Sequence, residues 1–473
     1  SLDKFKVEEF RWNSRIEGDF LPEEVRQAEL TATAEMNLAA HTFSATNLRL
    51  IAGRTSVGAN LSASRIFANP ALDGQISIDR ADPGRLIKLV KFEYIPKDPS
   101  VLKTLNGNFA VALNESRLII KDIAVVLDGN PIKGVASIAG FVSPKIKFNF
   151  SAEHLDADRY LPESGTPPVA VNADPPPGVS VVDADRPALG TNNKSKEVET
   201  ATVQGILNLG SLRYQGLLAE GVQMAFNISN GVVRSNQRFQ KFYGGRLKGS
   251  VEFNNHDHEP VISLNQNLTG VQIGSLLQDL QGKKPIDGTL ETTIRLVGHG
   301  PQLQDFKSTL NGDISATLSD GQFHGVDLDQ VIRDSKNLIA VSGLVSDPTA
   351  GITRFSKLTV QATIDQGILK GTKLEGTSTN FDFSGNGGID LGKDRVDYRI
   401  DAVVNDNPEG IAGIKIKELQ GLRIPIQVGG TLSSPTFQPE LQGVLKDPKV
   451  KAAADKLKQK LDNGARRLLD KLL

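Results

Sequence analysis

Apolar and polar residues alternate with a period of two along most of the chain. Clear runs of this kind cover residues 109–113, 358–364, 396–402 and 424–428. Successive side chains of a β-strand point to opposite faces, so each run predicts a strand with one apolar and one polar face. Asp-Gly and Asn-Gly pairs, which favour tight hairpin turns, separate many of the runs. The pattern therefore predicts a mainly β chain.

A short motif of an apolar residue, a polar residue and a glycine recurs ahead of several alternating runs. The glycines of this motif are Gly74, Gly107, Gly205, Gly288 and Gly312. A glycine permits a bend or bulge at the point where a strand begins. Self-similarity of this kind is typical of stacked, repeat-built architectures. Short helices are predicted between strands, at residues 85–91, 275–280 and 328–338.

The composition of residues 162–200 differs from the rest of the chain. Seven prolines lie there among Gly, Asp, Asn and Ser. Such a segment cannot bury enough apolar surface to order itself, so it is predicted to be a flexible linker or excursion. It divides the β pattern into an N-terminal region, 1–161, and a C-terminal region, 201–445.

The last 28 residues, 446–473, form a third kind of segment, a predicted basic amphipathic helix. Nine Lys and Arg residues stand against four Asp, a local charge of +5. The residues of the predicted apolar stripe and basic face include Val450, Leu457, Leu461, Leu468, Leu472, Lys456, Lys460, Arg466 and Arg467. Three roles remain open for this helix: contact with a membrane surface, packing on the end of the sheet, or pairing with an envelope protein.

Composition excludes several kinds of site. The net charge is −1, which gives no global attraction for nucleic acid, and the absence of cysteine rules out disulfides and thiolate metal sites. His256 and His258 flank Asp257 and could approach a metal, but the surrounding residues are more typical of a solvated hairpin tip. No nucleophile elbow, phosphate loop or zinc-protease motif is found. We therefore expect no catalytic residues, no metal and no cofactor.

A set of motifs in residues 265–445 resembles the AsmA family of envelope proteins from Gram-negative bacteria. The most specific are Leu310-Asn311-Gly312, which leads into Asp320-Gly321-Gln322-Phe323-His324-Gly325-Val326-Asp327-Leu328, and the closing Ile424-Pro425-Ile426-Gln427-Val428-Gly429-Gly430-Thr431-Leu432-Ser433-Ser434-Pro435. Residues 1–161 match more loosely, through the repeated glycine motif. The N-terminal anchor helix that the family usually carries is not found, and we expect a segment before residue 1 to supply it.

The resemblance implies a fold and a function. The fold would be an elongated, repeat-built antiparallel sheet curled into an open groove, with short edge helices and the C-terminal helix. The function would be non-enzymatic: a periplasmic protein, anchored in the inner membrane, that carries phospholipid to the outer membrane. Acyl chains would be its ligands. The predicted groove residues are Ile76, Ile78, Phe109, Val111, Leu113, Ile314, Leu318, Leu358, Val360, Ile364, Phe381, Phe383, Ile424, Ile426 and Val428.

Three alternatives remain open at the level of sequence. The apolar strand faces could close against each other as the core of a sandwich, in place of an open groove. The chain could also be a scaffold or assembly factor for outer-membrane proteins or lipopolysaccharide, without a lipid conduit. A hydrolase on a β-solenoid is a further rival, which would need carboxylates clustered at one repeat level. A polysaccharide-binding solenoid is disfavoured, since the chain has a single tryptophan and five tyrosines with which to stack sugars.

Overall fold

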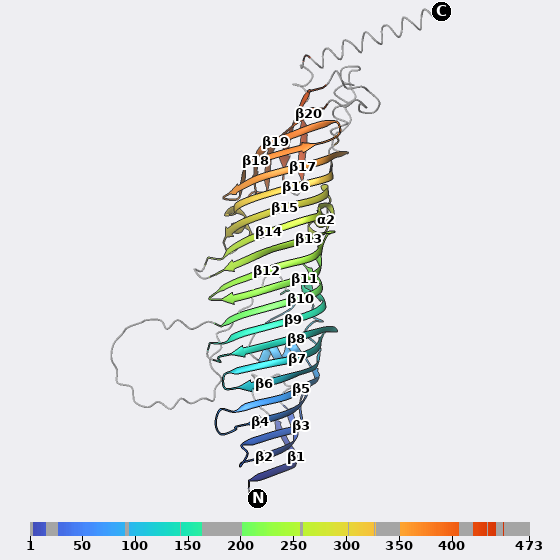
Figure 1. Ribbon diagram of the computed structural model, residues 1–473. Coiled ribbons are helices and arrows are strands. Elements are labelled where there is room, and N and C mark those ends of the chain that lie inside the picture. The colour runs from blue at the N-terminus through green and yellow to red at the C-terminus, as the bar shows by residue number, and fades with distance from the viewer. Residues whose placement is uncertain are drawn as a thin grey trace, which may run out of the picture. The chain divides into compact units, whose positions relative to one another are not determined.

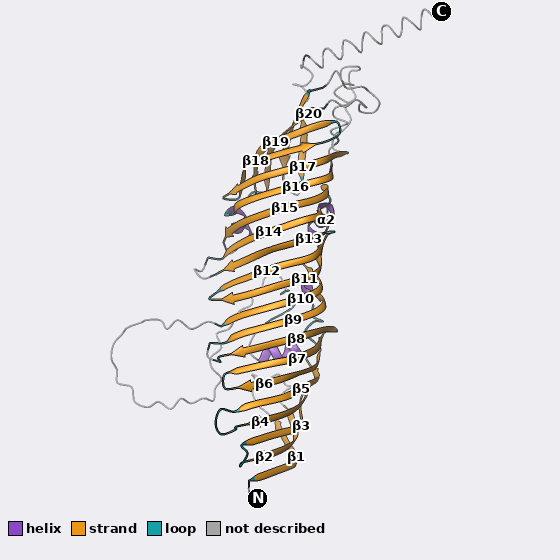
Figure 2. Cartoon of the chain, in the orientation of Figure 1, coloured by secondary structure: helices purple, strands orange, loops and turns teal. Residues whose placement is uncertain are grey.

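The computed structural model describes residues 3–15, 27–89, 94–141, 143–162, 201–255, 259–300, 302–325, 327, 351–405, 420–432, 434–440 and 448. Within them, 22 strands are hydrogen-bonded into a mostly antiparallel sheet, with few and short helices (Figures 1 and 2). The prediction of a mainly β, antiparallel fold is confirmed. The runs of alternating residues at 109–113, 358–364, 396–402 and 424–428 all lie in strands.

The chain divides into two compact units, residues 1–233 and 234–473. Unit 1 contains eleven of the described strands and one α-helix. Their bounds are β1 Lys4–Arg15, β2 Gln27–Asn37, β3 Thr42–Ala52, β4 Thr55–Ser64, β5 Ala71–Ala81, α1 Pro83–Leu89, β6 Leu105–Asn114, β7 Arg117–Leu127, β8 Asn130–Ala139, β9 Lys145–Asp156, β10 Thr202–Tyr214 and β11 Leu217–Ser229. A 3-10 turn, η2 (Ala157–Arg159), follows β9. The strand β12 (Val232–Phe242) contains the division between the units.

One strand pair in unit 1 departs from the hairpin pattern. β9 and β10 run parallel, with Ile146 beside Val203 and Phe150 beside Leu207. Parallel neighbours need a connection that returns along the whole length of the strand, which a tight turn cannot provide. The proline-rich segment lies in the interval between these two strands. Of that segment, the structure describes Pro162, which forms an isolated bridge with Pro96.

Unit 2 contains the remaining ten described strands and two helices. Their bounds are β13 Gly245–Asn254, β14 Val261–Gln272, α2 Ile273–Gln281, β15 Ile286–His299, α3 Leu303–Ser308, β16 Asn311–His324, β17 Ile352–Asp365, β18 Ile368–Thr377, β19 Phe381–Asp390, β20 Arg395–Val404, β21 Arg423–Gly430 and β22 Pro435–Pro439. Consecutive described strands pair antiparallel from β13 to β22.

The predicted short helices are partly confirmed. α2 contains the predicted helix 275–280, and α1 covers the described part of the helix predicted at 85–91. The helix predicted at 328–338 lies outside the described residues. The sequence did not predict α3, a six-residue helix at Leu303–Ser308.

Three glycines of the repeated motif share one backbone conformation. Gly107, Gly288 and Gly312 have φ angles of 135°, 138° and 142°. A side chain at Gly107 or Gly312 would overlap backbone atoms of the next strand. The motif therefore marks a backbone conformation that L-residues rarely adopt, beside a close approach of two strands. Gly74 and Gly205 do not share this φ; there a side chain would overlap a side chain of the neighbouring strand.

Candidate apolar ligand site

The strand register of unit 1 gathers apolar side chains on one face, which we call the apolar face. Directly opposed residues on neighbouring strands share a face. Ile76 on β5 opposes Phe109 on β6, and Val111 on β6 opposes Ile120 on β7. The same face continues to β1, where Phe5 opposes Met36 of β2. Most of these side chains are only half-buried, so the described part of unit 1 does not pack this face as a core.

An apolar cavity of about 390 Å³ lies on this face. Strands β5 to β10 and the turn after β9 supply its lining, which is apolar at all but three positions. The lining residues are Ile78, Leu105, Phe109, Ile120, Ile123, Val125, Leu127, Asn130, Ile132, Phe150, Ala152, His154, Leu155, Tyr160, Leu207 and Leu209. The volume lies within the range of small-molecule pockets, so the cavity could hold part of a hydrocarbon chain.

The three polar lining residues lie near one edge of the sheet, where β7 and β9 end and β8 begins. The His154 ring lies 2.8 Å, Nδ1 to Oγ, from Ser211. The Tyr160 hydroxyl donates a hydrogen bond of 3.2 Å to Asp128. Burial and the nearby Asp128 carboxylate raise the pKa of Tyr160, which keeps its hydroxyl protonated as a donor at neutral pH. The polar groups of these residues thus lie beside the cavity, whose own surface is almost entirely apolar.

Asp128 connects Tyr160, beside the cavity, to the loop that precedes β6. Its carboxylate accepts hydrogen bonds from the backbone N–H groups of Leu102, Lys103 and Thr104, at 2.6, 2.9 and 3.0 Å. Burial alone would raise the pKa of Asp128, but these donors and Tyr160 together hold the pKa below its ordinary value. The carboxylate is therefore ionised at neutral pH and fixes the loop beside the cavity.

A second contact holds the same loop. The Arg159 guanidinium donates to Asp98 at 2.7 Å, and Asp98 also accepts from the hydroxyl of Ser100 at 2.6 Å. Mainly through these two partners, the pKa of Asp98 falls to about 2. The loop between α1 and β6 is thus anchored to the turn after β9.

The five predicted groove residues of unit 1 all lie on the apolar face. Ile78 and Phe109 line the cavity, and Ile76, Val111 and Leu113 continue the same rows of side chains. Their role in lipid contact stays a prediction.

The predicted groove residues of unit 2 are more deeply buried than those of unit 1. Eight of its ten predicted groove residues are buried, and most belong to a packed core in which Phe381 is 0%, Ile424 1% and Ile426 1% exposed. These eight are Leu318, Leu358, Ile364, Phe381, Phe383, Ile424, Ile426 and Val428. Ile314 and Val360 are half-buried. In unit 2, therefore, most of the predicted groove residues pack against protein side chains.

Most of the cavity lining was not among the predicted residues. Leu207 and Leu209 alternate with polar residues in β10, so the same signal could have identified them. Ile120 and Ile123 lie on either side of a register shift in β7, where alternation breaks down. Alternation could not predict that β9 pairs with β10 in parallel. This pairing brings Leu207 and Leu209 to the cavity.

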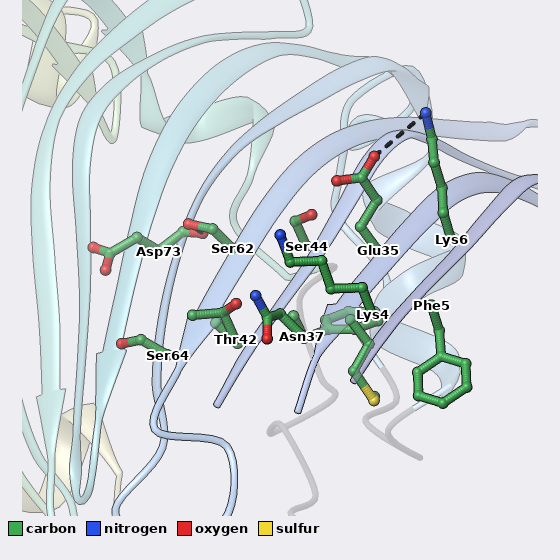
Figure 3. Close-up of a pocket in the computed structure, with 13 residues that line it drawn as sticks. Lys4, Phe5, Lys6, Glu35, Asn37, Thr42, Ser44, Ser62, Ser64 and Asp73 are labelled. Atoms are coloured by element: carbon green, nitrogen blue, oxygen red, sulfur yellow. Dashed lines mark hydrogen bonds and ion pairs between the residues drawn. The ribbon is translucent and has the colours of Figure 1, made fainter. Parts of the chain in front are cut away.

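A second cavity in unit 1, of about 530 Å³, has a lining of mixed character (Figure 3). It lies at the opposite end of β5 from the apolar cavity, where the ends of β1 to β5 meet. Its lining includes Ser44, Ser62 and Asp73. Lys6 lies 3.3 Å from Glu8 and 3.5 Å from Glu35, and hydrogen bonds to these carboxylates raise its pKa. The lining thus combines apolar side chains, among them Phe5, Met36 and Phe43, with charged and hydroxyl groups.

Several predicted features lie outside the described residues. They are the His256-Asp257-His258 cluster and the helix residues Val450, Leu457, Leu461, Leu468, Leu472, Lys456, Lys460, Arg466 and Arg467. Among the residues that are described, no three His, Asp or Glu side chains are grouped to hold a metal ion. In the same residues, every helix is too short or too polar to cross a membrane.

Comparison with known proteins identifies the family. Residues 90–374, more than half of the chain, match the model of the AsmA family. The chain belongs to the AsmA family. Over 374 residues it is 20% identical to Protein AsmA of Escherichia coli (strain K12). The match covers 77% of this chain and 59% of that relative, so the chain spans about three fifths of the length of the relative.

Family membership has two direct consequences. AsmA proteins are envelope proteins, and the relationship to the E. coli protein implies a location in a Gram-negative envelope. The family is not known for enzymes.

Proposed function

We propose that this chain is a non-enzymatic lipid-binding protein, and that the apolar face of unit 1 holds the acyl chains of phospholipid during transfer between the inner and outer membranes. Burying hydrocarbon stabilises a complex by about 0.8 kcal/mol per CH₂ group. An apolar cavity on a half-buried strand face offers such burial without specific polar contacts. The single observation that carries the proposal is the 390 Å³ cavity, whose lining is apolar except at one edge.

The polar side chains beside the cavity fit the same proposal. An acyl chain ends in a polar head, which must keep its hydrogen bonds. Asn130, His154 and Tyr160 border the cavity near the ends of β7 and β9 and the start of β8. In this arrangement the head lies at the sheet edge and the chain lies on the apolar face. We place the protein in the periplasm with attachment to the inner membrane, as the family resemblance suggests.

A scaffold role is the second candidate, and the packed core of unit 2 favours it. Side chains such as Phe381 and Ile424 are already buried against protein, and they are not free to contact a ligand. A protein that only organised outer-membrane assembly would need such a core and would not need the open apolar face of unit 1.

Lipid analysis of the purified protein separates these two functions. The protein would be isolated from envelopes, and extracted phospholipid would be quantified for wild type, Phe109→Asp and Asn108→Asp. Phe109 lines the cavity, whereas Asn108 is exposed on the opposite face of β6. We expect Phe109→Asp to lose most bound phospholipid and Asn108→Asp to retain it. Absence of phospholipid from folded wild-type protein would favour the scaffold.

A further inference from the structure

Two phenylalanines of β9 form a stacked pair at the apolar cavity. The ring centroids of Phe148 and Phe150 are 5.1 Å apart and the rings are inclined by 19°. Phe150 lines the cavity, and Phe148 lies beside it on the same face of the strand. Any movement of Phe148 across the sheet therefore reaches the cavity through Phe150.

The position of Phe148 depends on a glycine of the neighbouring strand. Gly205 of β10 pairs with Phe148 in the parallel register. A Cβ atom at Gly205 would overlap three carbon atoms of the Phe148 ring. The ring thus occupies the space that a side chain at position 205 would need. Gly205 does not have a positive φ, so its backbone conformation does not require a glycine at this position.

We propose that Gly205 sets the depth of the apolar cavity, and thereby which acyl chains fit. This inference rests on the proposed function. A methyl group at position 205 would lift the Phe148 ring off the sheet, because backbone lies beneath it. Phe150 must then rise with its stacked neighbour or lose the contact. If Phe150 rises, the space between the sheet and a bound chain shrinks, because Phe150 and not Phe148 lines the cavity.

A shallower cavity discriminates by the shape of the chain. A straight chain can lie flat along the strand face, whereas a kinked chain needs extra depth at its bend. A single methylene in an apolar pocket changes specificity by about tenfold or more. We therefore assign Gly205 as a residue that determines specificity for kinked over straight acyl chains, acting through Phe148 and Phe150.

Binding of cis-parinaric acid and of its all-trans isomer tests the proposal, because the two probes differ in shape and not in composition. Fluorescence titration would compare wild type with Gly205→Ala. We expect the variant to bind the kinked probe about tenfold more weakly and the straight probe with a clearly smaller loss. Unchanged affinity for the kinked probe, or equal losses for both, would overturn the proposal.

Two further variants complete the design. Gly205→Ala combined with Phe148→Leu removes the overlapping ring and should restore binding of the kinked probe. Phe148→Leu alone removes the ring above Gly205 and does not push Phe150 into the cavity, so this variant should bind the kinked probe at least as well as wild type. Weaker binding would contradict the proposal even if Gly205→Ala does not fold. Failure of wild-type protein to bind either probe would instead refute the proposed function.

Unit 2 supplies a matched control. Gly376 lies beneath the ring of Phe383 in the same manner, but there the ring belongs to a packed core. Gly376→Ala should lower the melting temperature and leave the affinity for both probes unchanged. An equal loss of probe binding in this variant would mean that Gly205→Ala acts through general destabilisation.

Discussion

Glycines in this protein serve two distinct purposes. At Gly107, Gly288 and Gly312 the backbone has a φ that L-residues rarely adopt. At Gly205 and Gly376 the backbone is ordinary, and the missing side chain makes room for an aromatic ring. The first kind shapes the strands, and the second kind sets the height of side chains above the sheet. The sequence revealed the repeated motif, but it could not show which glycines have an unusual φ and which make room for a ring. The ring that covers a glycine comes from another strand.

Gly312→Ala is expected to destabilise unit 2 substantially. Gly312 of β16 has a φ of 142°, and a Cβ atom there would overlap the carbonyl oxygen of Arg295 on the neighbouring strand β15. Strain of this kind costs about 1–3 kcal/mol, and the overlap with backbone adds to it. Urea unfolding measures the change. In the control Gly129→Ala, φ is 87° and no atom lies within 4 Å of the new Cβ, so the cost should be clearly smaller.

Asp98 should contribute to the acid sensitivity of unit 1. Its pKa is about 2, below the ordinary value of 3.8, so its contribution to stability is complete above pH 3.8. The contribution is lost as the pH falls through the folded-state pKa of about 2. Between pH 4 and pH 2 the melting temperature of Asp98→Asn should therefore fall less than that of wild type. Parallel curves for the two proteins would show that the contacts of Asp98 with Ser100 and Arg159 do not stabilise the fold.

At the scale of elements, alternation predicted the strands but not what covers their apolar faces. β6 and β21 both alternate apolar with polar residues, yet Phe109 lines a cavity and Ile424 lies in a packed core. The difference arises from partners far apart in the sequence. In unit 2, residues of β16, β17, β19, β20 and β21 meet in one core. In unit 1, the face around β6 to β9 keeps a cavity. Because β6 and β21 show the same period-two pattern, the sequence could not predict whether other side chains cover their apolar faces.

This contrast predicts different costs for truncating an isoleucine in each unit. Ile424 is 1% exposed within the core, so Ile424→Ala should cost about 2–5 kcal/mol in urea unfolding. Ile123 is half-buried and borders the cavity, so Ile123→Ala should cost clearly less. Equal costs would indicate that the unit 1 face is packed as tightly as a core in solution.

At the scale of the whole molecule, the family resemblance contributed what patterning could not. The ordered motifs between residues 265 and 445 indicated the AsmA family, and the match over residues 90–374 establishes it. The envelope location follows from that membership. Sequence did not indicate that the candidate lipid site is concentrated in unit 1, because the most specific motifs lie in unit 2, where apolar residues form a core.

The basic helix predicted at residues 446–473 is the candidate contact with a membrane surface. Its local charge of +5 should attract anionic headgroups, each basic residue near the surface adding about 1 kcal/mol. Flotation with phosphatidylglycerol-containing liposomes should therefore recover the full chain and much less of a chain that ends at residue 445. High salt should weaken the recovery. Equal flotation of the two chains would exclude this role for the helix.

The central claim is that the apolar face of unit 1 contacts lipid in the envelope. Photo-crosslinking from a small diazirine amino acid at Ile123 tests it most directly. Ala124 is the next residue on the opposite, exposed face, and Ile426 lies in the core of unit 2. We predict phospholipid adducts at position 123 and none at 124 or 426, read by mass spectrometry of the intact protein. Adducts that are absent at 123, or equally frequent at 123 and 124, would contradict the account.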